Sequence, residues 1–242
     1  MQILAVDVGG SHVKVLVSGQ TEPRRMNSGR DLTAAAMVEG VKALTSGWAY
    51  DVVSLGYPGQ VVHNMPAHEP VNLAAGWIGF DYQAAFERPV RVINDAAMQA
   101  LGSYEGGRML FIGLGTGLGS AMIVDGHLEP MELGHLPYKR RKTYEDYVGQ
   151  RGLDRLGKKK WREEVGIVID TFRKALQPDY IVLGGGNAKL IKRLPSDVRR
   201  GANANAFVGG FRLWEPEAAA ADSGQEAAEQ VVANDGAFIQ ED

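Results

Sequence analysis

A short segment near the start of the chain combines residue types that bind phosphate. Asp7 ends an apolar stretch, Gly9 and Gly10 follow it, and Ser11 and Lys14 come next. Glycines allow backbone N–H groups to approach a phosphate closely, a serine hydroxyl can donate to it, and a carboxylate can hold Mg²⁺ through water. Considered alone, the segment fits a plain hairpin turn equally well. As a functional site it would bind a phosphorylated donor, with Asp7 as the metal-binding residue.

Two further glycine runs occur later in the chain. Gly115, Thr116 and Gly117 lie between two expected strands, as the first segment does. Two such turns are hard to explain by packing, because glycine costs conformational entropy on folding. Gly185 and Gly186 belong to a third run, ahead of an expected helix whose positive end could bind another anionic group or a nucleotide. No G-x-G-x-x-G opens a helix after the first strand, which disfavours a dinucleotide-binding fold.

One acidic residue stands where it could transfer a proton. Asp95 follows Asn94 at the end of an expected strand, where a helix begins. A carboxylate there could accept the proton of an attacking hydroxyl, a contribution of about 10²–10⁴ in rate. The same position also suits an ordinary helix N-cap, so both interpretations stay open at this point.

Glu132 and His135 follow an expected hairpin and are separated by Gly134. The chain has no cysteine and five histidines, so a zinc ion bound by several histidines is disfavoured. The pair is better explained as hydrogen-bonding groups for a polyol, although a lone histidine is more often structural.

Composition narrows the classes of protein that the chain can be. Its 242 residues are 45% hydrophobic and 23% charged, which excludes disorder as the dominant state. The lack of cysteine removes disulfides, thiolate metal sites and cysteine nucleophiles. No signal peptide and no apolar run of about 20 residues is present, so we expect a cytoplasmic protein without a membrane partner.

The charge is distributed unevenly. After Arg212 the chain carries eight acidic residues and no Lys or Arg, which leaves 26 basic and 21 acidic residues in the rest. Residues 139–162 hold ten basic and three acidic residues. This segment could bind a polyanion, and a solvated basic helix face explains it equally well.

Strands and helices alternate along the chain, and each half begins with a strand, a glycine-rich turn and a returning strand. The pattern predicts two similar α/β lobes that face a cleft, a small one at 1–95 and a large one at 96–214, followed by an acidic, mobile tail at 215–242. The expected strands cover residues 3–8, 13–17, 51–55, 90–93, 109–114, 120–124 and 180–183, and the expected helices 32–44, 96–104, 144–156 and 161–176.

Over roughly residues 1 to 214, the ordered motifs resemble those of the ROK sugar kinases, and most closely the short polyphosphate-type glucokinases. The resemblance implies the two-lobed actin-like (ribonuclease H-like) ATPase fold with a central cleft, and a homodimer. The segments that carry it are Asp7, Gly9, Gly10 and Lys14; Tyr57, Pro58 and Gly59; Asn72 through Trp77; Asn94 and Asp95; Gly115, Thr116 and Gly117; Glu132, Gly134 and His135; and Gly184, Gly185 and Gly186.

The resemblance implies transfer of a phosphoryl group to the 6-hydroxyl of glucose, with Asp95 as the base and Mg²⁺ as the ion. The residues it places on the sugar are Asn72, Asn94, Glu132 and His135. The residues it places on the donor are Asp7, Gly9, Gly10, Lys14, Thr116 and Gly117.

The chain departs from the family at one segment. Many ROK members have a cysteine-rich zinc loop after the Glu-x-Gly-His motif, which ends in a glutamate that touches the sugar. Leu136 to Tyr147 stands in its place, so we expect no zinc, and Glu145 takes the position of that glutamate. Polyphosphate-using relatives also lack the loop, which favours polyphosphate as the donor and leaves ATP open.

Three alternatives remain from the sequence. The chain could be a kinase for another hexose, an actin-like ATPase or kinase for a non-sugar metabolite, or a non-catalytic sugar sensor. ROK-type repressors carry a DNA-binding motif ahead of the first strand, which here begins at Ile3, so we expect no nucleic-acid partner.

Overall fold

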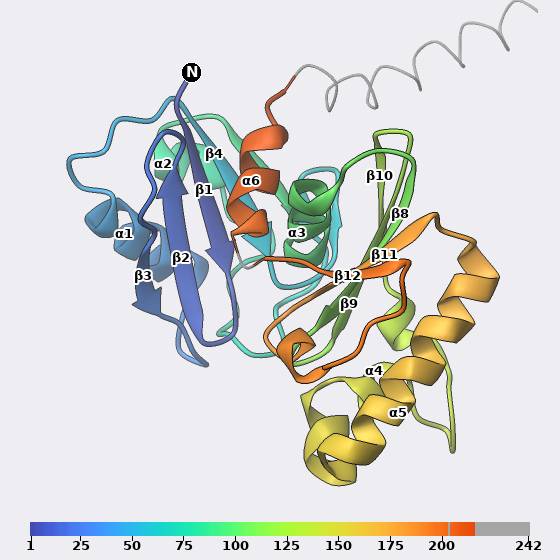
Figure 1. The fold of residues 1–242 in the computed structure, drawn as a ribbon. Coiled ribbons are helices and arrows are strands. Elements are labelled where there is room, and N and C mark those ends of the chain that lie inside the picture. Colours follow the sequence, from blue (N-terminus) through green and yellow to red (C-terminus); the bar gives the residue numbers. More distant parts are fainter. Residues whose placement is uncertain (203, 216–242) are drawn as a thin grey trace, which may run out of the picture.

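The chain builds two five-stranded sheets, one from each half of the sequence (Figure 1). The structure, a computed structural model, describes residues 1–202 and 204–215. The acidic tail expected at 215–242 therefore lies, apart from Glu215, outside the described residues.

The first sheet has the order β3-β2-β1-β4-β7. Strands β1, β2 and β3 pair antiparallel, whereas β1, β4 and β7 pair parallel. Its central strands are almost wholly apolar, as is typical of strands covered on both faces. The bounds are β1 (Ile3–Val8), β2 (His12–Val17), β3 (Arg24–Asn27), β4 (Val52–Tyr57) and β7 (Val90–Asn94).

The second sheet, with the order β10-β9-β8-β11-β12, repeats this plan. Strands β8, β9 and β10 pair antiparallel, and β8, β11 and β12 pair parallel. The shared pattern confirms the internal repeat predicted from the sequence. The bounds are β8 (Arg108–Leu114), β9 (Leu118–Val124), β10 (His127–Met131), β11 (Tyr180–Gly184) and β12 (Val198–Arg200).

Helices cover the outer face of each sheet. Helix α1 (Ala34–Leu44) begins at its N-cap Thr33 and buries Met37 and Val41 in the core of the first sheet. Helix α5 (Gln150–Leu176) covers the second sheet in the same way and buries Trp161 and Phe172 in its core. The shorter elements are α2 (Tyr82–Phe86), α4 (Glu145–Val148) and the two-stranded sheet β5 (Val61–Val62) with β6 (Met65–Pro66).

Two helices lie between the sheets and connect them (Figure 1). Helix α3 (Asp95–Ser103) follows β7 directly and packs its alanines against the second sheet. Helix α6 (Asn205–Arg212) comes after the second sheet but packs Phe207 against Ala5 of the first. The two helices cross so closely that a Cβ at Gly102 would overlap the carbonyl of Asn205, and one at Gly209 that of Met98.

The helices expected at 144–156 and 161–176 are present, the first divided at Gly149, and the interruption expected between them is confirmed. After α4, α5 runs on to Leu176 with a break at Gly157, where φ is 73° and ψ is 159°. The helix expected after Gly186 is wrong: a single 3₁₀ turn, η2 (Ala188–Leu190), stands there. The carbonyls of Leu190 and Ile191 accept instead from arginine side chains, Arg162 and Arg200.

Strands β3 and β12 were not predicted, because they are short and mostly polar edge strands without apolar alternation. Strand β10 is the second strand of the hairpin expected near residues 125 and 126. Among the described residues, no helix is long and apolar enough to cross a membrane.

Candidate active site

The first glycine turn joins β1 to β2 and is fixed by a third strand. The backbone N–H of Gly9 donates to His12 O at 3.0 Å. Ser28, just after β3, donates through its hydroxyl to Gly9 O at 2.6 Å and through its N–H to Ser11 O at 3.0 Å. Gly10 faces Asn72, whose Cβ lies 3.6 Å from where a Cβ of residue 10 would stand. The turn and the Asn72 loop are therefore in contact.

Asp7 and Lys14 face each other across the same turn. They are cross-strand neighbours in the β1–β2 register, with Nζ of Lys14 3.5 Å from Oδ2 of Asp7. Burial raises the pKa of Asp7, and the charge and hydrogen bond of Lys14 oppose that rise. The carboxylate thus lies in a poorly hydrated position with one cation beside it.

Asp95 opens α3, but it is not the cap of that helix. Asn94 is the N-cap: its side-chain oxygen accepts from Ala97 N at 3.0 Å, and its amide donates to Gly59 O at 3.0 Å. The structural alternative of Asp95 as the N-cap is therefore wrong. Asp95 accepts from Ala96 N at 2.8 Å, which leaves most of its hydrogen-bonding capacity for other partners.

The pKa of Asp95 is raised from 3.8 to about 7. Burial is the largest cause, the negative charge of Asp7 adds to it, the Ala96 N–H opposes it, and the charge of Glu132 raises it further. The pKa of Asp95 is therefore raised by the charge of Asp7, at the first glycine turn, and by that of Glu132, from the second half of the chain. A pKa near 7 suits a general base at neutral pH.

The second glycine turn joins β8 to β9 and lies beside Asp95. Gly119, at the start of β9, packs on Ala96 so closely that a Cβ there would lie 2.7 Å from the Ala96 Cβ. Thr116, at the tip of the turn, is exposed, and Gly115 N donates to Gly117 O at 3.2 Å.

The third glycine run supports this second turn. Gly185 has a left-handed φ of 78°, and a side chain at this position would also meet the backbone of Leu114, so both features favour glycine here. Asn187 donates from its N–H to Leu114 O at 2.9 Å and from its side chain to Gly115 O at 3.3 Å. Gly186 is exposed at the same place.

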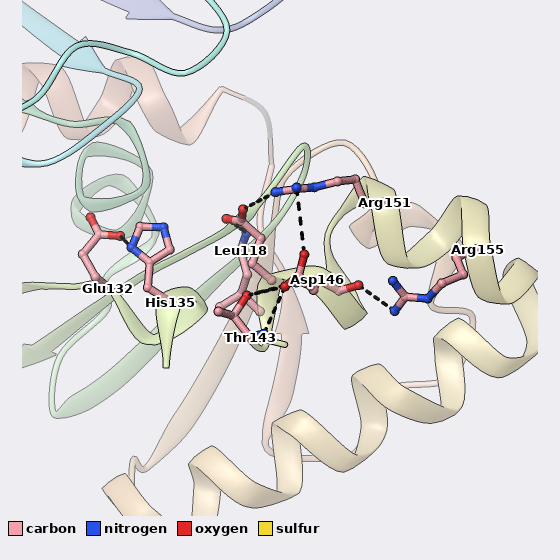
Figure 2. Close-up of polar contacts among 8 residues, drawn as sticks. Leu118, Glu132, His135, Thr143, Asp146, Arg151 and Arg155 are labelled. Atoms are coloured by element: carbon pink, nitrogen blue, oxygen red, sulfur yellow. Dashed lines mark hydrogen bonds and ion pairs between the residues drawn. The ribbon is translucent and has the colours of Figure 1, made fainter. Parts of the chain in front are cut away.

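Glu132 and His135 flank a 3₁₀ turn, η1 (Leu133–His135), with Nδ1 of His135 3.5 Å from Oε2 of Glu132 (Figure 2). The His135 side chain is 68% exposed, and that of Glu132 is 41% exposed and so partly shielded from water. Burial raises the pKa of Glu132, His135 lowers it, and the charge of Glu145 raises it. Glu145 is therefore within electrostatic reach of the pair.

Glu145 lies against the second glycine turn. Its Oε2 accepts from Leu118 N at 3.3 Å, and a Cβ at Gly117 would overlap its carboxylate. Its Oε1 is 3.3 Å from Nη2 of Arg151. Glu145 thus contacts the turn, and its charge also acts on Glu132.

An aromatic cluster and an ion pair hold the segment 136–147. The rings of Tyr138 and Tyr144 stack at 4.4 Å, and Tyr147 meets Tyr138 edge-on at 5.2 Å. Lys139 pairs with Glu164 of α5 at 2.8 Å, and hydrogen bonds to Glu164 and Tyr138 raise the pKa of Lys139 to about 12. Lys139 is thereby committed to a partner inside the protein, unlike the exposed Lys142.

Several residues that shape the site were not found from the sequence. Ser28 supports the first turn, and Asn187 the second. Glu69 orders the Asn72 loop by accepting from Gly76 N and Trp77 N, each at 3.1 Å. For Arg151, the only indication in the sequence was its position in the basic segment 139–162.

These features define the class of protein. Two sheets of matching order, each with a glycine turn between its first two strands, form the actin-like two-lobed fold. The family model described as ROK family matches residues 3–152, and the chain belongs to the ROK family. The resemblance drawn from the motifs is confirmed.

Individual relatives agree with this. The chain is 27% identical over 207 residues to a polyphosphate glucokinase of Mycobacterium tuberculosis, a match that covers 75% of this chain and 76% of the relative. The inorganic polyphosphate/ATP-glucomannokinase of Arthrobacter sp. strain KM has a TM-score of 0.74 and 25% identity, covering 86% of this chain and 96% of that one. A ROK family glucokinase from Streptomyces griseus, solved with glucose and AMPPNP, shares the fold with a TM-score of 0.74 at 16% identity, covering 88% of this chain and 99% of that one.

Proposed function

We propose that this protein transfers a phosphoryl group from polyphosphate or ATP to the 6-hydroxyl of glucose. The proposal rests mainly on Asp95, whose pKa is about 7. The charges of both Asp7 and Glu132 act on this acid. Phosphoryl transfer requires positioning and charge neutralisation more than covalent chemistry, and the site offers groups for both.

In this proposal Asp95 accepts the proton of the sugar hydroxyl as its oxygen attacks phosphorus. Lobes 1–95 and 96–214 supply the two sides of the site, and α6 returns to the first sheet. The sugar hydroxyls are bound by Asn72, Asn94, Glu132, His135 and Glu145. The donor is bound by Asp7, Gly9, Gly10, Ser11, Lys14, Gly115, Thr116, Gly117, Gly185 and Gly186.

The residues present fit Mg²⁺. This ion keeps several water ligands and usually binds through one or two carboxylates together with substrate phosphates. Among residues 1–202 and 204–215, no group of three or more His, Asp or Glu could hold a metal ion by itself. Asp7 would hold it, and when bound the ion neutralises charge on the transferring phosphoryl group.

Polyphosphate is the donor that we favour. The relatives from Mycobacterium tuberculosis and Arthrobacter carry polyphosphate in their names. On this chain Arg140, Arg141 and Lys142 and the α5 residues 158–160 are exposed cations, and attraction to a chain of phosphates adds up over many contacts.

A coupled assay of glucose 6-phosphate formation tests the proposal. Wild-type protein is given glucose with either polyphosphate or ATP at two salt concentrations. We expect turnover with polyphosphate, with a KM for polyphosphate that rises more steeply with salt than the KM for ATP. Product from neither donor would exclude the proposed function. Product from ATP alone would exclude polyphosphate as the donor, and the proposed glucose kinase activity would still hold.

We further propose that the protein acts in the cytoplasm as a homodimer. Sedimentation of the purified protein over a range of concentrations would measure its oligomeric state, and a single species of about 26 kDa would contradict the homodimer.

A further inference from the structure

The second glycine turn has an acidic neighbour that a phosphate-binding turn should exclude. The carboxylate of Glu145 lies directly against Gly117 and accepts the N–H of Leu118 at 3.3 Å. A donor phosphate at this turn would meet a negative charge at close range, and like charges repel more strongly where water is displaced. Some group must cancel that charge if the turn is to bind a phosphorylated donor.

Arg151 is the cation in contact with that carboxylate. Its Nη2 lies 3.3 Å from Oε1 of Glu145, and its Nη1 lies 3.9 Å from Oδ1 of Asp146 (Figure 2). The guanidinium therefore bridges two consecutive acids at the start of α4.

The backbone fixes Arg151 at the turn. Gln150, the preceding residue, donates its N–H to Thr116 O at 3.0 Å and accepts from the side chain of Asn187 at 3.0 Å. Asn187 in turn donates to Gly115 O. The first turn of α5 is thus attached to the glycine turn from two sides, and Arg151 cannot move away without breaking these contacts.

Much of the Arg151 side chain is exposed and can meet a ligand. The Arg151 side chain is 73% exposed, although it contacts two carboxylates. Arginine carries five N–H donors in a rigid plane that matches phosphate oxygens, and its charge persists at any physiological pH. An anion that reaches the turn would meet these donors.

On the basis of the proposed function, we propose that Arg151 binds the phosphate chain of the donor and positions Glu145. One edge of the guanidinium holds Glu145 against the turn and cancels its charge. The remaining N–H groups bind donor phosphates beyond the one that is transferred. Donor binding and the orientation of the sugar-side glutamate are then coupled through one side chain.

Arg155 provides a matched control. It stands one helical turn further along α5 and donates to Asp146 O at 2.8 Å (Figure 2). It also covers the Tyr147 ring at 4.9 Å. It has no ion pair with Glu145. Arg155→Gln removes the same charge from the same helix and so controls for the general loss of attraction to a polyanion.

The first experiment measures the binding of tripolyphosphate by titration calorimetry at constant salt. We expect Arg151→Gln to weaken binding about 10- to 100-fold, as for a lost charge-assisted hydrogen bond, and Arg155→Gln to change it much less. Arg151→Lys should recover part of the loss. Combining Glu145→Gln with Arg151→Gln should also recover part of it, because the uncancelled charge is then gone.

Binding in Arg151→Gln equal to that in Arg155→Gln would overturn the proposal, and so would a double variant no better than Arg151→Gln alone. The second experiment separates this result from the proposed function. In the glucose assay, Arg151→Gln should raise the KM for the donor and also the KM for glucose. Normal tripolyphosphate binding by the wild type without any sugar phosphate would overturn the proposed function and leave the anion site.

Discussion

Asp95 titrates in the range where a base has to act. Its pKa of about 7 results from burial and from neighbouring acids, and both disfavour the ionised form. In the free enzyme the ionised, proton-accepting form therefore gains population as the pH rises through 7. The environment that strengthens this base also limits the fraction of molecules that are active below neutral pH.

We expect kcat/KM for glucose to rise with pH and to reach half of its plateau near pH 7, because that ratio reports groups of the free enzyme. Asp95→Asn should lower kcat by about 10²–10⁴-fold and retain glucose binding, since the amide keeps the shape without accepting the proton. Pre-steady-state assays and glucose titrations measure the two effects. Normal turnover in Asp95→Asn would exclude its role as the base and favour a sugar-binding protein without catalysis.

At the residue scale, the sequence predicts the acids better than their partners. Asp7 and Asp95 could be found because each lies at a strand end beside a glycine or a helix start, which is a local pattern. Ser28 could not, because its bond to Gly9 depends on the pairing of β3, a polar strand without alternation. Arg151 meets Glu145 only because α4 and α5 fold back on the glycine turn.

At the scale of elements, the crossing of α3 and α6 depends on glycine. Gly209→Ala should lower the free energy of unfolding by about 1–3 kcal/mol, because the new methyl group would overlap the carbonyl of Met98. Thermal unfolding should show a lower Tm. The control is Gly166→Ala on α5, where no atom lies within 4 Å of the new Cβ and the Tm should rise slightly. Equal effects of the two variants would contradict a tight crossing.

The segment 136–147 is a second element whose geometry can be tested. Glu164→Gln releases Lys139, and through the stack of Tyr138 on Tyr144 it should loosen the residue that precedes Glu145. We expect the KM for glucose to rise about threefold to tenfold with kcat less affected. Glu163→Gln, an exposed neighbour on the same helix, removes an equal charge and should leave the KM unchanged. An unchanged KM in both variants would show that the ion pair does not position Glu145.

The strands that are rich in apolar residues were predicted best. Strands β1, β4, β8 and β11 are runs of buried apolar residues and were found. The interruption between the helices expected at 144–156 and 161–176 was found as well, at Gly157. The single turn after Gly186 was not, because arginine side chains from elsewhere in the chain bind the carbonyl groups there.

At the scale of the whole molecule, the site residues come from both halves of the chain. Asp7 and Asn72 belong to the first half, and Glu132, His135 and Glu145 to the second. A sugar bound between them would draw the halves together and expel water, which strengthens each polar contact.

We therefore expect small-angle scattering to show a smaller radius of gyration with glucose than without it. The same contraction should occur in Asp95→Asn, because closure requires sugar binding and not transfer. An equal concentration of glycerol controls for solvent contrast. A radius that stays constant at saturating glucose would contradict closure.

The position of α6 has a consequence for how the protein is made. Ala5 and Leu16 are covered by Phe207, which the ribosome adds nearly two hundred residues later. While the chain is being synthesised, that apolar face of the first sheet stays open to water and to other nascent chains. The N-terminal half therefore cannot finish burying its surface during translation, and a chaperone that binds apolar strands would find it there until residue 212 leaves the exit tunnel.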